Sequence, residues 1–413
     1  GIPGGRNAYA DKTLDTKHDW EKFRYQYRVW GRLVYNPDTE PEVWRRYLRR
    51  EFQGAAQPVE EALAHASRIL PTITTAHDPS ASNNSYWPEM YMNMPIVDPN
   101  SSVPYRDTPS PRKFGTVSPL DPQLFTTIEE CAEALLSGQV GAKYSASEVA
   151  AWLSDLALAA ARNQARIVSA APKRNAPEFR RVAADVAIQS GVGEFFAWKI
   201  RSAILWSLYE RTSGRTALTE AVKAYRTARD AWAGMAELAK PIYASNITYG
   251  PNPQMIGHWM DRLPAIEADL ADMEKRLTEA DPAAAQAADP PGLRRAIAAV
   301  LNPGRRPTLA CKHAAAPYFE PGKPLEVALS FPEGDGKQVN LLYRHVNQGE
   351  RWRTAEMQWR DRQYRGVIAA EYTQSPYPLQ YYFEVHQAGA ATLSPGFGPE
   401  LSKQPYFVVR RQA

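Results

Sequence analysis

Along the first 280 residues, apolar side chains recur at alternating spacings of three and four, the period of amphipathic helices. The clearest stripe lies between His18 and Tyr35 and consists of Trp20, Phe23, Tyr27, Trp30 and Val34. A stripe this broad is expected to be buried, either by the helices downstream or by an absent domain. Proline disfavours a helical residue before it, so Asn36-Pro37 is expected to end this helix and a second helix to begin near Pro41.

Six further helical segments are expected downstream. One follows Pro58, and the others cover Phe125–Ser137, Ala146–Ala170, Ala176–Thr212, Arg215–Leu238 and His258–Ala280. Alanine-rich turns allow helices to approach closely, and glycine or proline breaks between the segments suit short connections. The pattern therefore predicts a helical bundle. Within it, residues 78–123 are rich in proline and aromatic residues and have no helical period, which predicts a long ordered loop.

The hydrophobic period changes to two after the alanine- and proline-rich stretch 280–292. In PLEVALSF, for example, alternate apolar residues from Leu325 to Phe331 share one face, and QVNLLYRHV, LQYYFEVHQ and YFVVRR follow the same pattern. Roughly seven short strands in about 105 residues are typical of an immunoglobulin-like or fibronectin-like sandwich. The sequence thus predicts two domains: an all-helical domain over 1–303 and a β-sandwich over 304–413.

Composition excludes several classes of function. The 413 residues include 49 basic and 45 acidic side chains, interleaved along the chain, so no basic surface for nucleic acid is expected. No apolar run is long enough to span a membrane. The two cysteines, Cys131 and Cys311, have no metal-ligand spacing, and neither a metal nor a cofactor is expected. The 11 Trp and 21 Tyr favour carbohydrate as a partner, because flat side chains stack on sugar rings.

The common catalytic motifs of hydrolases and nucleotide-binding enzymes are absent. Paired carboxylates could hydrolyse a glycoside, but Glu60-Glu61, Glu129-Glu130 and the pair Asp269 and Asp272 fall within helical patterns. Such pairs are expected on solvated helix faces. No catalytic residue is therefore assigned.

Two irregular segments contain residue types suited to sugar hydroxyls and sugar faces. These are NITYGPNPQMIGHW, from Asn246 to Trp259, and the proline-rich loop. The candidate substrate-binding residues are Tyr249, Asn252, His258, Trp259, Trp87 and Tyr91. If both loops form one binding surface, Trp87 and Trp259 should be partly exposed. The alternative is that Trp259 fills the core and His258 caps the next helix.

The run YRVWGRLVYNPDTEPEVWRRYLRREF, from Tyr27 to Phe52, resembles a segment of large bacterial glycoside hydrolases of the alpha-glucuronidase type. In those proteins the segment follows the catalytic barrel. The matching residues are Trp30, Gly31, Arg32, Leu33, Tyr35, Asn36, Pro37, Asp38, Trp44 and Phe52. The resemblance implies a noncatalytic C-terminal region that braces an upstream barrel and lines its substrate cleft.

On that interpretation the parent protein is a glycoside hydrolase, this chain alone is not its active part, and a homodimer is left open. Two alternatives come from other classes: a self-standing carbohydrate-binding protein, and an enzyme with an unrecognised site in the helical domain. The sequence does not fix the compartment, although a periplasmic or secreted location is favoured.

Overall fold

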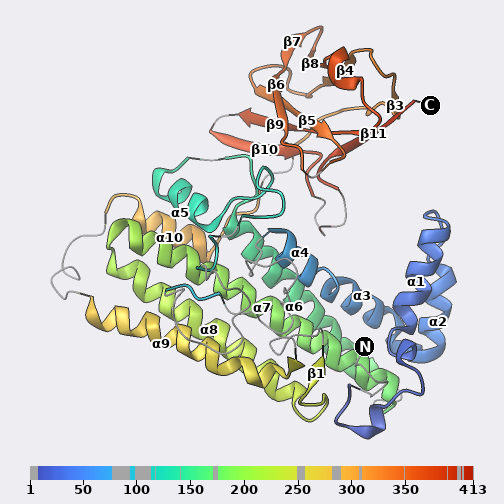
Figure 1. Ribbon diagram of the computed structural model, residues 1–413, viewed down its shortest axis with the longest axis vertical. Helices are drawn as coiled ribbons and strands as arrows, with labels where there is room; N and C mark the ends of the chain where they lie inside the picture. The colour runs from blue at the N-terminus through green and yellow to red at the C-terminus, as the bar shows by residue number, and fades with distance from the viewer. Residues whose placement is uncertain are drawn as a thin grey trace. The chain divides into compact units, whose positions relative to one another are not determined.

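The chain forms two compact units, which we call the helical unit and the sandwich unit (Figure 1). The helical unit comprises Gly1–Leu136 and Ser145–Pro303, and the sandwich unit comprises Ser137–Tyr144 and Gly304–Ala413. The predicted fold class, a helical part followed by an appended β domain, is confirmed. The computed structural model describes residues 8–76, 94–97, 113–116, 118–139, 141–170, 175–248, 256–280, 290–306, 309–347, 349–387, 389–397, 401 and 404–412.

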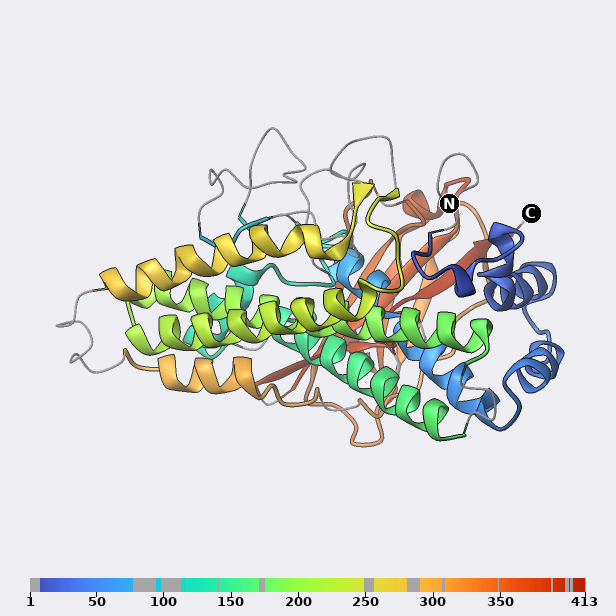
Figure 2. The ribbon, with the colours of Figure 1, turned by 90° about the horizontal axis from the view of Figure 1, so that it is seen from below.

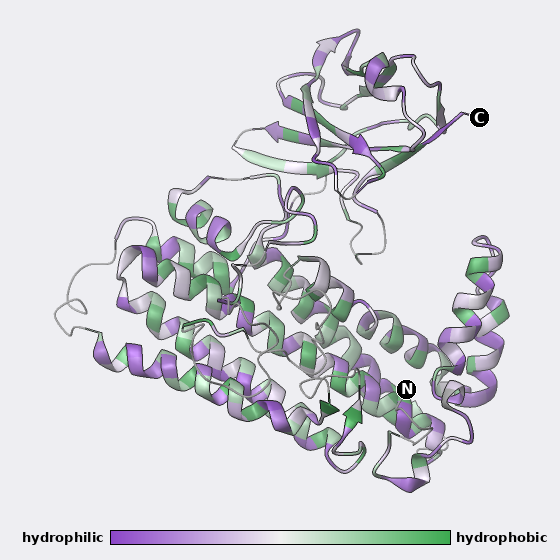
Figure 3. Cartoon of the chain, in the orientation of Figure 1, coloured by the Kyte–Doolittle hydropathy of each residue, from purple (hydrophilic) through white to green (hydrophobic). Residues whose placement is uncertain are grey.

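Long helices packed side by side form the core of the helical unit. The α-helices are α1 (Arg24–Tyr35), α2 (Glu42–Phe52), α3 (Ala56–Ala66), α4 (Ile69–Ala76), α5 (Ile128–Ser137), α6 (Ala146–Ala170), α7 (Pro177–Thr212), α8 (Arg215–Ala239), α9 (Leu263–Glu279) and α10 (Leu293–Leu301). Figure 2 shows α6, α7, α8 and α9 running alongside one another, with α7 packed between α6 and α8. Apolar residues recur along these helices in Figure 3. The third predicted helix is interrupted and forms both α3 and α4.

Two glycines explain how closely α7 approaches its neighbours. A Cβ at Gly191 would lie 2.5 Å from the Cβ of Met235 on α8. A Cβ at Gly193 would lie 3.0 Å from Ile69 Cδ1 on α4 and 3.2 Å from the Cβ of Ala157 on α6. Such distances leave no room for a side chain, so glycine lets α7 pack against three helices at once.

The N-terminal stripe is exposed in this chain, so the helices downstream do not bury it, and burial by an absent domain stays a prediction. Helix α1 has no buried residue. Trp20 is 51% exposed, Tyr27 55% and Trp30 66%. The helices downstream therefore do not cover this face. The adjoining α2 behaves differently, because Trp44, Tyr47, Leu48 and Phe52 are all buried.

The described part of the sandwich unit has two sheets. The strands are β3 (Tyr318–Phe319), β4 (Leu325–Leu329), β5 (Gln338–His345), β6 (Arg353–Glu356), β7 (Gln358–Arg360), β8 (Gln363–Ile368), β9 (Leu379–Gln387), β10 (Ala390–Ser394) and β11 (Phe407–Arg411). The larger sheet has the order β3-β11-β9-β5-β6, with β10 also paired to β9, and the smaller sheet has the order β4-β8-β7. Buried and more exposed residues alternate along β4 and β8, as expected for a sheet with one covered face. Val327, Leu341, Tyr364 and Phe383 belong to the shared core.

The short segment Ser137–Tyr144 belongs to the sandwich unit through polar contacts. Arg306 donates hydrogen bonds to the carbonyl oxygens of Ala142, at 2.5 Å, and Lys143, at 2.7 Å. The backbone N–H of Phe397 donates to the Tyr144 hydroxyl at 2.8 Å. The helical unit likewise contains a two-stranded piece, β1 (Ile247–Thr248) with β2 (Ile256–Gly257), although an all-helical domain is predicted. The predicted boundary at residue 303 stays a proposal.

We expect the sandwich unit to lose stability in acid through Glu350. Its carboxylate accepts hydrogen bonds from the Tyr372 hydroxyl and from His345 Nδ1, the latter at 2.7 Å. Burial alone would raise the pKa of Glu350, but these hydrogen bonds outweigh burial and lower it. A carboxylate whose pKa is lower in the folded state stabilises the fold above its unfolded pKa, near pH 4, and this contribution disappears as the pH falls further.

Glu350→Gln should therefore cost on the order of 1 kcal/mol at pH 7 and progressively less below about pH 4. Pulse-labelling hydrogen exchange of β5 and β9 across a urea series measures this difference. Glu356→Gln, which changes an exposed carboxylate on β6, is the matched control. If Glu350→Gln lowers the free energy of unfolding by the same amount at pH 7 and below about pH 4, the assignment to Glu350 is contradicted.

A candidate binding cleft in the helical unit

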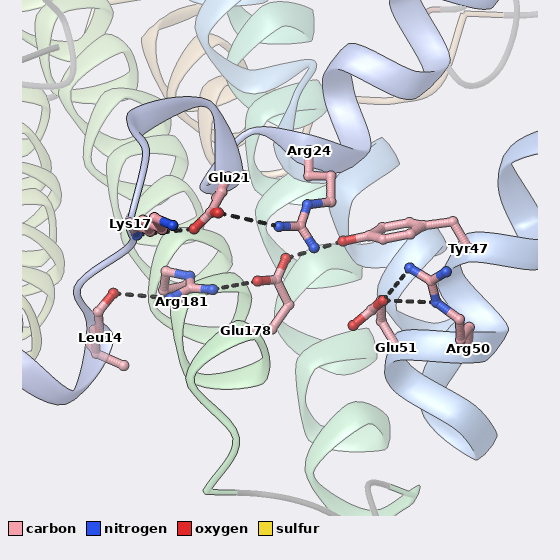
Figure 4. Close-up of polar contacts among 9 residues, drawn as sticks. All are labelled: Leu14, Lys17, Glu21, Arg24, Tyr47, Arg50, Glu51, Glu178 and Arg181. Carbon is pink, nitrogen blue, oxygen red and sulfur yellow. Dashed lines mark hydrogen bonds and ion pairs between the residues drawn. The ribbon is translucent and has the colours of Figure 1, made fainter.

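A polar network fixes the segment before α1 onto α7 (Figure 4). Arg181 donates a hydrogen bond to the carbonyl oxygen of Leu14 at 2.9 Å and another to the Glu178 carboxylate. The Tyr47 hydroxyl, from α2, donates to the same carboxylate at 3.3 Å. Glu21 lies 3.8 Å from the Arg24 guanidinium at the start of α1. Polar contacts thus fix Leu14 and α2 to α7, and the pair of Glu21 with Arg24 joins the segment to the first residue of α1.

A second connection joins the first described residues to the segment after α8. Tyr9 and Tyr243 form an isolated antiparallel bridge, in which Ala244 N–H donates to Ala8 at 2.7 Å. Their rings lie 5.2 Å apart. Burial, together with the negative charge of Asp185, raises the pKa of Tyr9 well above its ordinary value, so Tyr9 stays neutral.

These connections leave a cleft of about 880 Å³ between α1, the end of α3, α7 and the segment around Tyr243 and Trp259. Its volume is in the range of about 300–1,000 Å³ typical of small-molecule sites. The exposed wall consists of Phe23 and Trp30, and the polar lining includes Gln26 and Gln189. The cleft therefore combines aromatic faces with amide groups.

Three polar side chains from distant parts of the sequence meet in the cleft, and we call them the Tyr243 cluster. Tyr243 is buried, whereas the side chains of Lys22 and Asp185 are 19% and 37% exposed. Lys22 Nζ donates to the Tyr243 hydroxyl at 2.7 Å, and that hydroxyl donates to Asp185 Oδ1. Lys22 Nζ also lies 3.7 Å from Asp185 Oδ1 and 4.7 Å from the centre of the Tyr243 ring. The ammonium and carboxylate charges compensate each other within the cluster.

Trp259 completes the buried wall beside the Tyr243 cluster. Its ring meets Tyr243 edge-on at 5.4 Å, and its carbonyl oxygen accepts a hydrogen bond from Trp232 Nε1 at 2.9 Å. Its side chain lines the cleft but is only 3% exposed, so the expectation of partial exposure is wrong. The indole N–H of Trp259 is buried and has no hydrogen-bond partner in the described part of the chain.

His258 has a local structural role. It is the N-cap of the short 3₁₀ helix Trp259–Arg262: Nδ1 accepts from Met260 N–H at 3.2 Å, and Asp261 accepts from the His258 backbone N–H at 2.8 Å. Burial lowers the pKa of His258, so the ring that accepts this bond is neutral. His258 therefore caps the next helix, as the alternative interpretation of this segment expects.

The other candidate residues, Trp87, Tyr91, Tyr249 and Asn252, lie outside the described residues, as does most of the proline-rich loop. Substrate binding by the six candidates stays a prediction. Sequence reasoning missed the Tyr243 cluster, because Lys22, Asp185 and Tyr243 are separated by long stretches of helix. Among the residues that line the cleft, Phe23 and Trp30 had a signal as members of the N-terminal stripe, and Trp259 had one as a candidate substrate-binding residue.

The described residues show no cluster of three or more His, Cys, Asp or Glu side chains that could hold a metal ion. Both cysteines are free, and burial raises the pKa of the Cys131 thiol to about 11. Of the helices described here, none is both long and apolar enough to cross a membrane.

Comparison with known proteins gives a likeness of fold. No family model matches the chain, and no curated protein sequence matches it. A solved structure with a similar fold is that of a GH138 enzyme targeting pectin rhamnogalacturonan II. The two chains are 15% identical with a TM-score of 0.52, and the match covers 67% of this chain and 41% of that one. The fold thus resembles part of a glycoside hydrolase, and the resemblance to the alpha-glucuronidase type stays a prediction.

Proposed function

We propose that the chain is a noncatalytic region of a glycoside hydrolase and that its helical unit braces a catalytic barrel domain. The observation that supports this most directly is the exposed aromatic face of α1. Large apolar side chains that lie together on a surface usually mark a site of association. Tyr27, Val34 and Tyr35 on α1, together with Trp20 just before the helix, form this surface, which we call the docking face.

The way α1 is held also favours a docking role. The network around Glu178 and Arg181 fixes the segment before α1 without using the docking face. A helix held in this way presents its aromatic side chains in a fixed arrangement, so a partner does not have to order them on binding. Preorganised aromatic side chains are the usual hot spots of protein interfaces.

The fold likeness favours a partner domain of a particular kind. In the GH138 enzyme the matching part is 41% of the chain, so most of that protein lies outside the shared fold. A carbohydrate-directed enzyme with a comparable accessory region is the simplest setting for the exposed helix. We therefore take the occupant of the docking face to be a catalytic barrel of the same enzyme.

The test uses the protein encoded by the complete reading frame that contains this chain. With Trp20→Ala and Tyr27→Ala combined, the catalytic domain should bind the helical unit at least about tenfold more weakly, because hot-spot aromatics each contribute more than about 1 kcal/mol. Limited proteolysis followed by size-exclusion chromatography measures whether the fragments stay together. Tyr377→Ala, which removes an exposed aromatic side chain from the sandwich unit, is the control. Fragments that stay associated in the double variant, or a reading frame without a second domain, would refute the proposal.

A further inference from the structure

The cleft of the helical unit has two walls of different character. Trp30 and Phe23 are on the exposed wall, and their side chains are 66% and 42% exposed. Tyr243 and Trp259 are on the buried wall. Amide groups from Gln26 and Gln189 and the guanidinium of Arg68 add polar groups to the lining. A ligand that fits both walls needs one apolar face and a rim of hydrogen-bonding groups.

The indole N–H of Trp259 is a buried donor at this cleft for which the described residues supply no acceptor. A buried donor without a partner costs about 1–3 kcal/mol, and native structures contain few of them. Trp259 is 3% exposed, lines the cleft, and its N–H has no hydrogen-bond partner among the described residues. A hydroxyl oxygen of a bound molecule would satisfy this donor.

The Tyr243 cluster restricts the charge of such a ligand. Lys22 and Asp185 are 3.7 Å apart and share the Tyr243 hydroxyl, so neither is an uncompensated charge. A ligand carrying its own charge would have to compete with this ion pair, whereas a neutral hydroxyl can add to it. The Tyr243 cluster therefore suits uncharged polar groups.

We infer that this cleft binds a neutral pyranose ring of a carbohydrate. The C–H face of the sugar stacks on Trp30, and one of its hydroxyl oxygens accepts the hydrogen bond of the Trp259 indole N–H. The inference goes beyond the bracing role. It does not depend on the docking face, because neither Trp20 nor Tyr27 lines the cleft.

Calorimetry and saturation-transfer NMR on this chain test the inference, with methyl glycosides of glucose, galactose, mannose and xylose and with cellobiose as probes. At least one should bind, and Trp30→Ala should raise its Kd about tenfold, since aromatic stacking is the main apolar contact. Trp30 is exposed, so its removal should leave the fold intact. Trp20→Ala, at an exposed tryptophan outside the cleft, is the matched control and should leave the Kd unchanged within about twofold.

A double-mutant cycle tests the hydrogen bond separately. Trp259→Phe keeps an aromatic ring but removes the N–H donor. One monodeoxy analogue of the bound sugar should bind more weakly than its parent to the wild-type chain, yet as well as its parent to Trp259→Phe. If the monodeoxy analogue loses the same affinity toward the wild-type chain and toward Trp259→Phe, the hydrogen bond from Trp259 to the sugar is refuted.

The remaining outcomes also decide the question. If no probe sugar binds, or if the apolar dye ANS or an amphipathic peptide binds the cleft while sugars do not, the inference is wrong. The corresponding uronic acids should bind no more tightly than the neutral glycosides, and tighter binding would refute a neutral ligand. If the Trp20 and Tyr27 variant no longer docks but still binds sugar, both proposals are supported, because docking and sugar binding then depend on different residues.

Discussion

Asp269→Asn is expected to lower the free energy of unfolding of the helical unit by about 3–5 kcal/mol, as when one partner of a buried ion pair is removed. Asp269 is on α9 and is 1% exposed, so the expectation that it belongs to a solvated helix face is wrong. Its Oδ2 accepts a hydrogen bond from the Tyr225 hydroxyl at 2.8 Å and lies 3.7 Å from Lys199 Nζ. Lys199 has no exposed surface and also donates to the carbonyl oxygen of Met94 at 3.0 Å.

The loss of stability in Asp269→Asn depends on the protonation state of Lys199. Burial lowers the pKa of Lys199 to about 8, and the Asp269 carboxylate keeps it from falling further. Asparagine can still accept the Tyr225 hydrogen bond, but it removes the negative charge. Lys199 is then either a poorly compensated buried cation or a neutral amine, and either state is unfavourable relative to the unfolded chain at pH 7.

Lys199 also makes the stability of the helical unit depend on pH. The pKa of Lys199 is lower in the folded state than in the unfolded state, so the unfolded chain binds more protons between about pH 8 and 10. Lys199 therefore lowers stability below its folded pKa, and this penalty is relieved as the pH rises through that window. In Asp269→Asn the folded pKa falls further, and the window should begin at a lower pH.

Urea unfolding followed by far-ultraviolet circular dichroism, which reports mainly the helices, measures this loss at pH 7 and pH 9. Glu267→Gln, at an exposed carboxylate on the same helix, is the control and should change stability by less than about 0.5 kcal/mol. A loss below about 1 kcal/mol in Asp269→Asn would show that Asp269 does not support the buried ammonium.

Periodicity located the helices and strands well, because the repeat of apolar positions depends on local geometry. The strands β4, β5, β9 and β11 and the long helices α6 to α9 lie where the pattern predicts them. The same pattern does not show which partner covers an apolar face. That is why the stripe through Trp20, Tyr27 and Trp30 could be recognised while its exposure could not. Asp269 was misplaced for a related reason, since the sequence does not show that Tyr225 and Lys199 reach it.

The candidate site depended on contacts that no local signal reveals. Lys22, Asp185 and Tyr243 come from three elements and meet only when α7 and the segments beside it are packed. Trp259 had a signal because it ends an irregular segment between long helices. Sequence reasoning left open whether this residue stacks on a ligand or fills the core. The structure gives it a position that allows both, since its ring is buried and one side lines the cleft.

Trp259→Ala should therefore cost about 3–5 kcal/mol, the loss expected when a buried tryptophan is truncated. The substitution removes the edge-on contacts with Tyr243, at 5.4 Å, and with His258, at 5.2 Å, and leaves a void in the buried wall. Trp30→Ala is the matched comparison, and because Trp30 is exposed it should cost less than about 0.5 kcal/mol.

The pair of variants separates the two roles of the cleft walls. If Trp259 belongs to the core, urea unfolding will show a large loss in Trp259→Ala and almost none in Trp30→Ala, whether or not a sugar is present. A loss below about 1 kcal/mol in Trp259→Ala would mean that the ring contributes little to the core. In that case its unpaired N–H would not be held in a buried wall, and the hydrogen bond proposed for the sugar would lose its structural basis.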